Sequence, residues 1–106
     1  GTLEKNENPL ESMKRELAEE ACYKANQWDH LGEMLPCPGY SDEIIHLFLA
    51  RELELIPNGP KGDEDEDLEV IHMTPDELDK RIHSKDEALD GKSITAWYRA
   101  KRMLNI

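Results

Sequence analysis

Three carboxylates crowd onto one helical turn near the start of the chain. Glu16, Glu19 and Glu20 fall within a short segment of helical pattern. At about 100° per residue, Glu16 and Glu20 lie one turn apart on the same face, with Glu19 beside them. Like charges this close repel each other, so the helix gains no stability from them. A bound divalent cation would turn this repulsion into attraction, so the cluster is a candidate metal site. The alternative interpretation is that the three carboxylates form a solvated face of the helix.

The helix that carries this cluster has clear start signals. Asn8 is expected as the N-cap, Pro9 as the first helical residue, and Glu11 as the partner of Asn8 in a capping box. The helix is predicted to end near Cys22, before a connection over residues 23–26. Its apolar stripe recurs at spacings of three and four and consists of Leu10, Met13, Leu17 and Ala21.

The remaining chain alternates strand and helix patterns. The run at residues 44–50 is apolar on both faces, which is typical of a central strand covered on both sides. Thr74, Pro75 and Glu77 repeat the helix-start signals. We predict strands at residues 28–35, 44–50 and 68–73, helices at 74–83 and 93–104, and Pro/Gly loops at 36–39 and 56–62. With no repeat and no domain boundary, the sequence predicts one mixed α/β domain over residues 1–106.

Composition narrows the possible partners. The 106 residues carry a formal charge of −11, so the chain has no general attraction for nucleic acids or anionic membranes. A phosphate-bearing ligand would need a cation at the contact. No apolar run approaches the roughly 20 residues of a membrane span, and no signal peptide is recognisable. The two cysteines form no CxxC pair, which favours reduced thiols in a cytoplasmic protein.

The start of the chain is unusual. It opens on Gly1 without an initiator methionine and soon enters a helix, and the predicted strands are few for a sheet. We therefore expect a fragment, a truncated chain, or a chain completed by a partner.

The spacing of the charged residues resembles the signature of the Nudix hydrolases, G-x5-E-x7-R-E-U-x-E-E-x-G-U, in which U is a bulky aliphatic residue. Seven of its nine fixed positions match, namely Gly1, Glu7, Arg15, Glu16, Leu17, Glu19 and Glu20. Tyr23 fits the last apolar position loosely. Cys22 replaces a glycine that usually serves as a left-handed helix cap, so Cys22 either strains that turn or ends the helix differently.

The resemblance implies a divalent metal, Mg²⁺ or Mn²⁺. Glu16 and Glu20 would be its principal ligands, and Glu19 a further ligand or a water-positioning group. Arg15 would pair with Glu7 and orient the cluster. An ordinary surface contact between Arg15 and Glu7, of little energetic value, is the alternative.

A second segment narrows the resemblance. Residues 38–43, Pro-Gly-Tyr-Ser-Asp-Glu, are similar to a loop of the ADP-ribose pyrophosphatases, with Cys37 where serine is usual. By this resemblance, Pro38 and Gly39 flank the terminal ribose of the substrate, and Glu43 points toward the metal and diphosphate. A plain Pro/Gly turn between two antiparallel strands is the alternative.

The acidic run at residues 63–67 is a third candidate. It does not form an EF-hand calcium loop, because Leu68 stands at the sixth position, where that loop needs glycine. Residues 64–70 are similar to a loop of the same pyrophosphatases. This resemblance assigns activation of the attacking water to Glu64 and metal binding to Glu66. A solvated charge run is the alternative.

Taken together, the resemblance implies a Nudix-type α/β/α sandwich with a mixed sheet, here lacking its N-terminal strands. It implies metal-dependent hydrolysis of ADP-ribose, or of a related nucleoside diphosphate sugar, to AMP (or another nucleoside monophosphate) and a sugar phosphate. It also implies a homodimer in the full-length form. A non-catalytic or truncated module that binds metal or nucleotide is the alternative.

Overall fold

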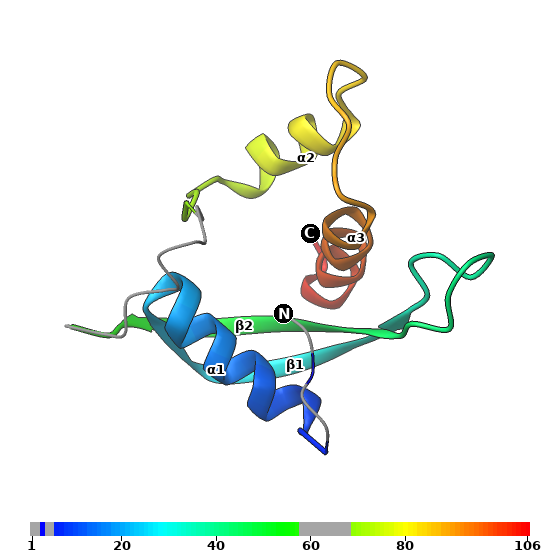
Figure 1. The fold of residues 1–106 in the computed structure, drawn as a ribbon. Helices are drawn as coiled ribbons and strands as arrows, with labels where there is room; N and C mark the ends of the chain where they lie inside the picture. Colours follow the sequence, from blue (N-terminus) through cyan, green and yellow to red (C-terminus); the bar gives the residue numbers. More distant parts are fainter. Residues whose placement is uncertain (1–2, 4–5, 58–68) are drawn as a thin grey trace. The chain divides into compact units, whose positions relative to one another are not determined.

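The computed structural model describes residue 3 and residues 6–57 and 69–106. Along the chain the elements are α1 (Pro9–Ala21), β1 (Tyr23–Met34), β2 (Ile45–Leu55), α2 (Pro75–His83) and α3 (Gly91–Leu104) (Figure 1). The predicted mixed α/β class is confirmed. Two compact units emerge, one of Gly1–His30 with Phe48–Val70 and one of Leu31–Leu47 with Ile71–Ile106. A single domain over residues 1–106 stays a prediction.

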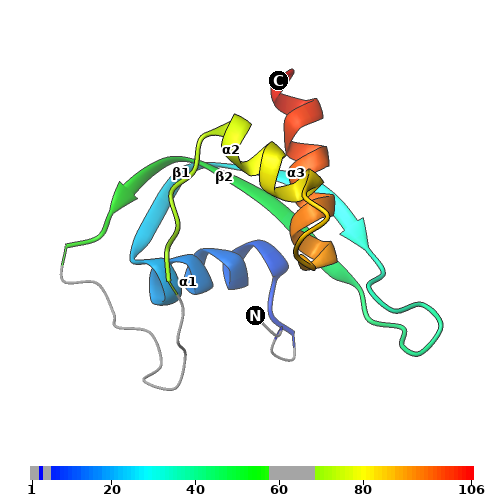
Figure 2. The ribbon, with the colours of Figure 1, turned by 90° about the horizontal axis from the view of Figure 1, so that it is seen from above.

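In the first unit, α1 runs alongside the ribbon formed by β1 and β2 (Figure 2). Its N-cap is the predicted one: the side-chain oxygen of Asn8 accepts hydrogen bonds from the amides of Leu10 and Glu11, at 2.9 and 3.2 Å. The return contact from Glu11 that would complete the predicted capping box stays a prediction, and the carboxylate of Glu11 contacts Lys14. Pro9 occupies the first helical position, where its missing N–H costs nothing. Local capping chemistry thus begins the helix that carries the acidic cluster.

Cys22 ends α1 in the left-handed region, with φ 57° and ψ 37°. Its amide donates to the carbonyl of Ala18 at 3.1 Å. The turn therefore has the conformation that glycine usually adopts, and the first of the two predicted outcomes for Cys22 is confirmed. A β-carbon in this conformation costs about 1 kcal/mol.

Replacing Cys22 with glycine is expected to raise the free energy of unfolding by about 1 kcal/mol, since glycine adopts the left-handed region without steric cost. Denaturant unfolding followed by circular dichroism measures the change. Cys22→Ala is the matched control, because alanine removes the thiol and keeps the β-carbon. Equal stabilisation by both replacements would show that the thiol, and not the backbone, is responsible.

The strands β1 and β2 form a two-stranded antiparallel sheet. The amide of Ile56, just after β2, donates to the carbonyl of Cys22, just before β1, at 2.8 Å. The predicted connection over residues 23–26 was wrong, because these residues belong to β1. Polar side chains there pair across the strands: Lys24 and Asn26 both contact the carboxylate of Glu54 at 3.1 Å. A hydrogen bond from Lys24, above all, lowers the pKa of Glu54.

Two other strand predictions need correction. Within the described residues β2 has one neighbour, β1, so the predicted central position is not seen there. Only Leu47 among the apolar residues of β2 is buried. The predicted strand over residues 68–73 is wrong for its described part, residues 69–73, which form no strand and leave Val70 and Ile71 exposed. A high β-propensity alone does not form a strand when no neighbouring strand pairs with its backbone.

In the second unit, α2 begins at the predicted capping box. The hydroxyl of Thr74 accepts from the amide of Glu77 at 3.2 Å, and the carboxylate of Glu77 accepts from the amide of Thr74 at 3.4 Å. The last helix, α3, begins at Gly91, earlier than the predicted residue 93, because Asp90 serves as its N-cap. In the ranges that the structure describes, no helix combines the length and apolarity needed to cross a bilayer.

Asp79 joins α2 to α3. Its carboxylate accepts hydrogen bonds from the indole N–H of Trp97 at 2.6 Å and from the ammonium of Lys101 at 2.7 Å. The bond from Lys101, followed by that from Trp97, lowers the pKa of Asp79 below its ordinary value. One turn later, a ring nitrogen of His83 lies 2.7 Å from the hydroxyl of Tyr98. Directed polar contacts therefore set the register between these two helices.

A close approach also ties α3 to the end of β1. Gly32 has φ 108°, and the guanidinium of Arg99 donates to the carbonyl of Leu31 at 2.7 Å. A β-carbon added at Gly32 would collide with that guanidinium. The backbone conformation requires glycine here, whereas the guanidinium lies at the end of a flexible side chain and can move.

Candidate metal centre

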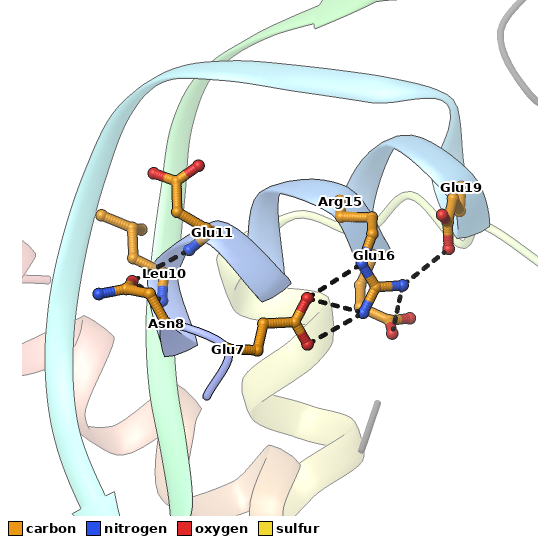
Figure 3. A network of polar contacts seen from close by, with 7 residues as sticks. All are labelled: Glu7, Asn8, Leu10, Glu11, Arg15, Glu16 and Glu19. Carbon is orange, nitrogen blue, oxygen red and sulfur yellow. Dashed lines mark hydrogen bonds and ion pairs between the residues drawn. The ribbon is translucent and has the colours of Figure 1, made fainter. Parts of the chain in front are cut away.

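Arg15 lies at the centre of a charged network on α1. Its Nε and Nη2 donate to the two carboxylate oxygens of Glu7, each at 3.3 Å (Figure 3). Glu7 precedes α1, and its side chain extends along the helix to Arg15. The contact between Arg15 and Glu7 is present as predicted, and its role in orienting metal ligands stays a prediction.

Arg15 also contacts two carboxylates of the acidic cluster. Its Nη1 lies 3.4 Å from Oε1 of Glu16 and 3.2 Å from Oε2 of Glu19. Hydrogen bonding to Glu7, together with the charges of Glu7, Glu19 and Glu16, raises the pKa of Arg15 above its ordinary value. Sequence reasoning missed these two contacts, although the i,i+4 spacing of Arg15 and Glu19 signals one of them.

The carboxylates of the acidic cluster differ in their exposure to solvent. The side chain of Glu16 is 13% exposed and that of Glu19 is 45% exposed. A carboxylate that has lost most of its water needs a compensating positive charge. Glu16 therefore depends most on a cation close by, whether that cation is Arg15 or a metal ion.

The other predicted site residues stand as follows. Glu20 lies on α1 one turn after Glu16. Glu64 and Glu66 fall outside the described residues. Pro38, Gly39 and Glu43 belong to the other compact unit.

Residues 36–39 form no helix or strand, as predicted, and a turn lies at residues 38–40. The carbonyl of Cys37 accepts from the amides of Tyr40 and Ser41, both at 2.9 Å, and the hydroxyl of Ser41 accepts from the amide of Glu43 at 3.0 Å. Tyr40 is 98% exposed at the tip. These contacts fix the backbone before Glu43, and the proposed contact of this turn with substrate stays a prediction.

The donor set fits a hard divalent cation. No group of three or more His, Cys, Asp or Glu side chains converges among the residues that the structure describes. Mg²⁺, however, usually keeps several waters and takes one or two carboxylates besides phosphate oxygens. Glu16 and Glu19 supply two such oxygens, and both approach a single cationic nitrogen. The full predicted ligand set of Glu16, Glu20 and Glu66 stays a prediction.

The chain is similar to known proteins over most of its length. Residues 1–98 match the family model of the NUDIX domain. Over 96 residues the chain is 38% identical to an ADP-ribose pyrophosphatase of Bacillus subtilis (strain 168) and 40% identical to a methanol dehydrogenase activator of Bacillus methanolicus. Each alignment covers 91% of this chain and 51% of the relative.

A third relative is more distant. The chain is 31% identical over 90 residues to a GDP-mannose pyrophosphatase of Escherichia coli (strain K12 / DH10B), covering 84% of this chain and 47% of that protein. The chain thus spans about half the length of the curated relatives it matches.

Proposed function

The chain belongs to the NUDIX domain family, and from this premise we propose that it catalyses metal-dependent hydrolysis of a nucleoside diphosphate sugar. The bond cleaved is the diphosphate of ADP-ribose or a related compound, and the products are AMP (or another nucleoside monophosphate) and a sugar phosphate. The observation that carries the proposal is the convergence of Glu16 and Glu19 on one cationic position within the family's signature helix.

The names of the relatives support this substrate class. Two of the three act, by name, on a nucleoside diphosphate sugar: one on ADP-ribose and one on GDP-mannose. Both substrates join a nucleotide to a sugar through a diphosphate. We propose ADP-ribose as the first substrate to test, because the ADP-ribose pyrophosphatase is the more similar of the two.

The formal charge of −11 makes a cation necessary for such a substrate. An anionic diphosphate is repelled by an acidic surface unless positive charge stands between them. When bound, Mg²⁺ or Mn²⁺ neutralises the diphosphate and polarises its phosphorus. Glu16 and Glu20 would hold that ion from α1, with Glu66 contributing from the acidic run and Glu19 as a further ligand or a group that positions water.

The remaining predicted residues would transfer a proton or position the substrate. Glu64 would remove the proton from the attacking water as a general base. Pro38 and Gly39 would flank the terminal ribose, and Glu43 would face the metal and diphosphate. For the complete protein we propose the α/β/α sandwich of the family, a homodimer and a cytoplasmic location.

The test is release of AMP from ADP-ribose by this chain and by a longer form that includes the adjoining sequence, with Mg²⁺, with Mn²⁺ and with a chelator. We expect AMP with either metal and none with the chelator, and GDP-mannose as a parallel substrate measures base and sugar preference. Binding of Mn²⁺ or nucleotide without turnover by either form would favour the non-catalytic module. AMP release that persists with the chelator would contradict the metal mechanism.

A further inference from the structure

The guanidinium of Arg15 occupies the point on which two carboxylates of the acidic cluster converge. Its Nη1 lies within 3.4 Å of an oxygen of Glu16 and within 3.2 Å of an oxygen of Glu19. We propose that Arg15 is an internal cation that holds these carboxylates together and competes with the divalent metal for them. This inference rests on the proposed function, because it takes the metal to bind at Glu16.

Electrostatics makes the two cations mutually exclusive. Glu16 and Glu19 lie three residues apart on α1 and repel each other, and the single positive charge of Arg15 offsets that repulsion. A divalent ion carries twice this charge and is the largest local charge wherever it binds. A second cation at the same oxygens would repel the guanidinium, so the contacts of Nη1 must break when the metal binds.

Glu7 provides the place where Arg15 remains after that exchange. Its two oxygens accept from Nε and Nη2, whereas Nη1 contacts Glu16 and Glu19. Rotation of the guanidinium away from Glu16 and Glu19 can therefore preserve the pair with Glu7. The contact with Glu7 favours the position of Arg15 away from the cluster and therefore favours metal binding. The contacts of Arg15 with Glu16 and Glu19 oppose metal binding.

This division of roles predicts opposite effects from the two partners of one ion pair. Arg15→Gln removes the competing cation, so Mn²⁺ is expected to bind about threefold more tightly, or tighter still, because the ion pairs with Glu16 and Glu19 no longer have to be broken. Glu7→Gln removes the alternative partner and leaves Arg15 on the cluster, so Mn²⁺ is expected to bind about threefold more weakly. If Arg15 and Glu7 merely oriented the ligands, both replacements would weaken binding.

The experiment is titration of the full chain with Mn²⁺, followed by the electron paramagnetic resonance signal of the free ion. Thermal unfolding with and without Mn²⁺ gives an independent measurement: the metal is expected to raise the melting temperature of Arg15→Gln more than that of the parent. Lys14→Gln is the matched control, since Lys14 is on the same helix and pairs with Glu11 at 3.5 Å, outside the acidic cluster. Its Mn²⁺ affinity is expected to equal that of the parent.

If Arg15→Gln loses helix content, Arg15→Lys replaces it, because lysine keeps the charge and lacks the fork that bridges Glu7 and the cluster. Its Mn²⁺ affinity is expected to lie between those of the parent and the glutamine variant. Weaker binding by every Arg15 variant, alongside normal binding by the parent, overturns the competition and leaves the proposed function intact. A parent that binds no Mn²⁺ and releases no AMP overturns both.

Discussion

Glu16→Gln is expected to lower the rate of AMP release from ADP-ribose about 100-fold or more, since even residues that only support metal ligands cost 10- to 100-fold on replacement. The amide keeps the shape of the side chain and removes the negative charge that would hold the metal ion. Glu16 is the more shielded of the two carboxylates that converge on Arg15, so solvent compensates least for this loss. Steady-state AMP production at saturating Mg²⁺ measures the effect.

Glu11→Gln is the matched control for this prediction. Glu11 lies on the same helix, its side chain is 67% exposed, and its carboxylate contacts Lys14. The same chemical change there is expected to leave the rate of AMP release within about twofold of the parent, as exposed ion pairs contribute little. Equal rates for Glu16→Gln and the parent would remove the metal mechanism proposed for α1.

Gly32→Ala is expected to lower the free energy of unfolding by about 1–3 kcal/mol, chiefly through backbone strain, because the exposed guanidinium of Arg99 can move away from the added carbon. The backbone at Gly32 has φ 108°, which residues with a β-carbon rarely adopt. The added carbon would also collide with the guanidinium of Arg99, which donates to the carbonyl of Leu31. Urea unfolding followed by tryptophan fluorescence measures the change.

Gly39→Ala is the control, since nothing lies within 4 Å of a β-carbon built at Gly39. Its free energy of unfolding is expected to stay within about 0.5 kcal/mol of the parent. Arg99→Ala in the Gly32→Ala background separates the two causes, because it removes the collision and leaves the backbone strain. A double variant as unstable as Gly32→Ala itself would assign the whole effect to the backbone.

Helix starts were the most predictable part of the fold. Asn8 with Pro9, and Thr74 with Glu77, begin their helices where the sequence places them. Each cap is built from residues within one turn, so no distant contact is needed to satisfy the first amides. The start of α3 lies before the predicted residue 93, because Asp90, a residue type common at N-caps, serves as its N-cap.

Strand ends were less predictable. Residues 23–26 alternate apolar and polar side chains over only four residues, and they are strand because β1 pairs with β2, where Lys24 and Asn26 meet Glu54 across the sheet. Conversely, residues 69–73 have an apolar pattern and form no strand. In both places the outcome depends on whether a neighbouring backbone is present, which is not a local property of the sequence.

For the candidate site, the sequence by itself determined that Glu16, Glu19 and Glu20 lie close together on α1, because the helical period brings these carboxylates to one side. It also determined that Arg15 and Glu7 pair. Only the tertiary structure decided that the same guanidinium reaches Glu16 and Glu19, and that Arg99 closes over Gly32. Spacing along a helix restricts the direction of a side chain, whereas the rotamer of a long arginine is chosen by all the charges and carbonyls around it.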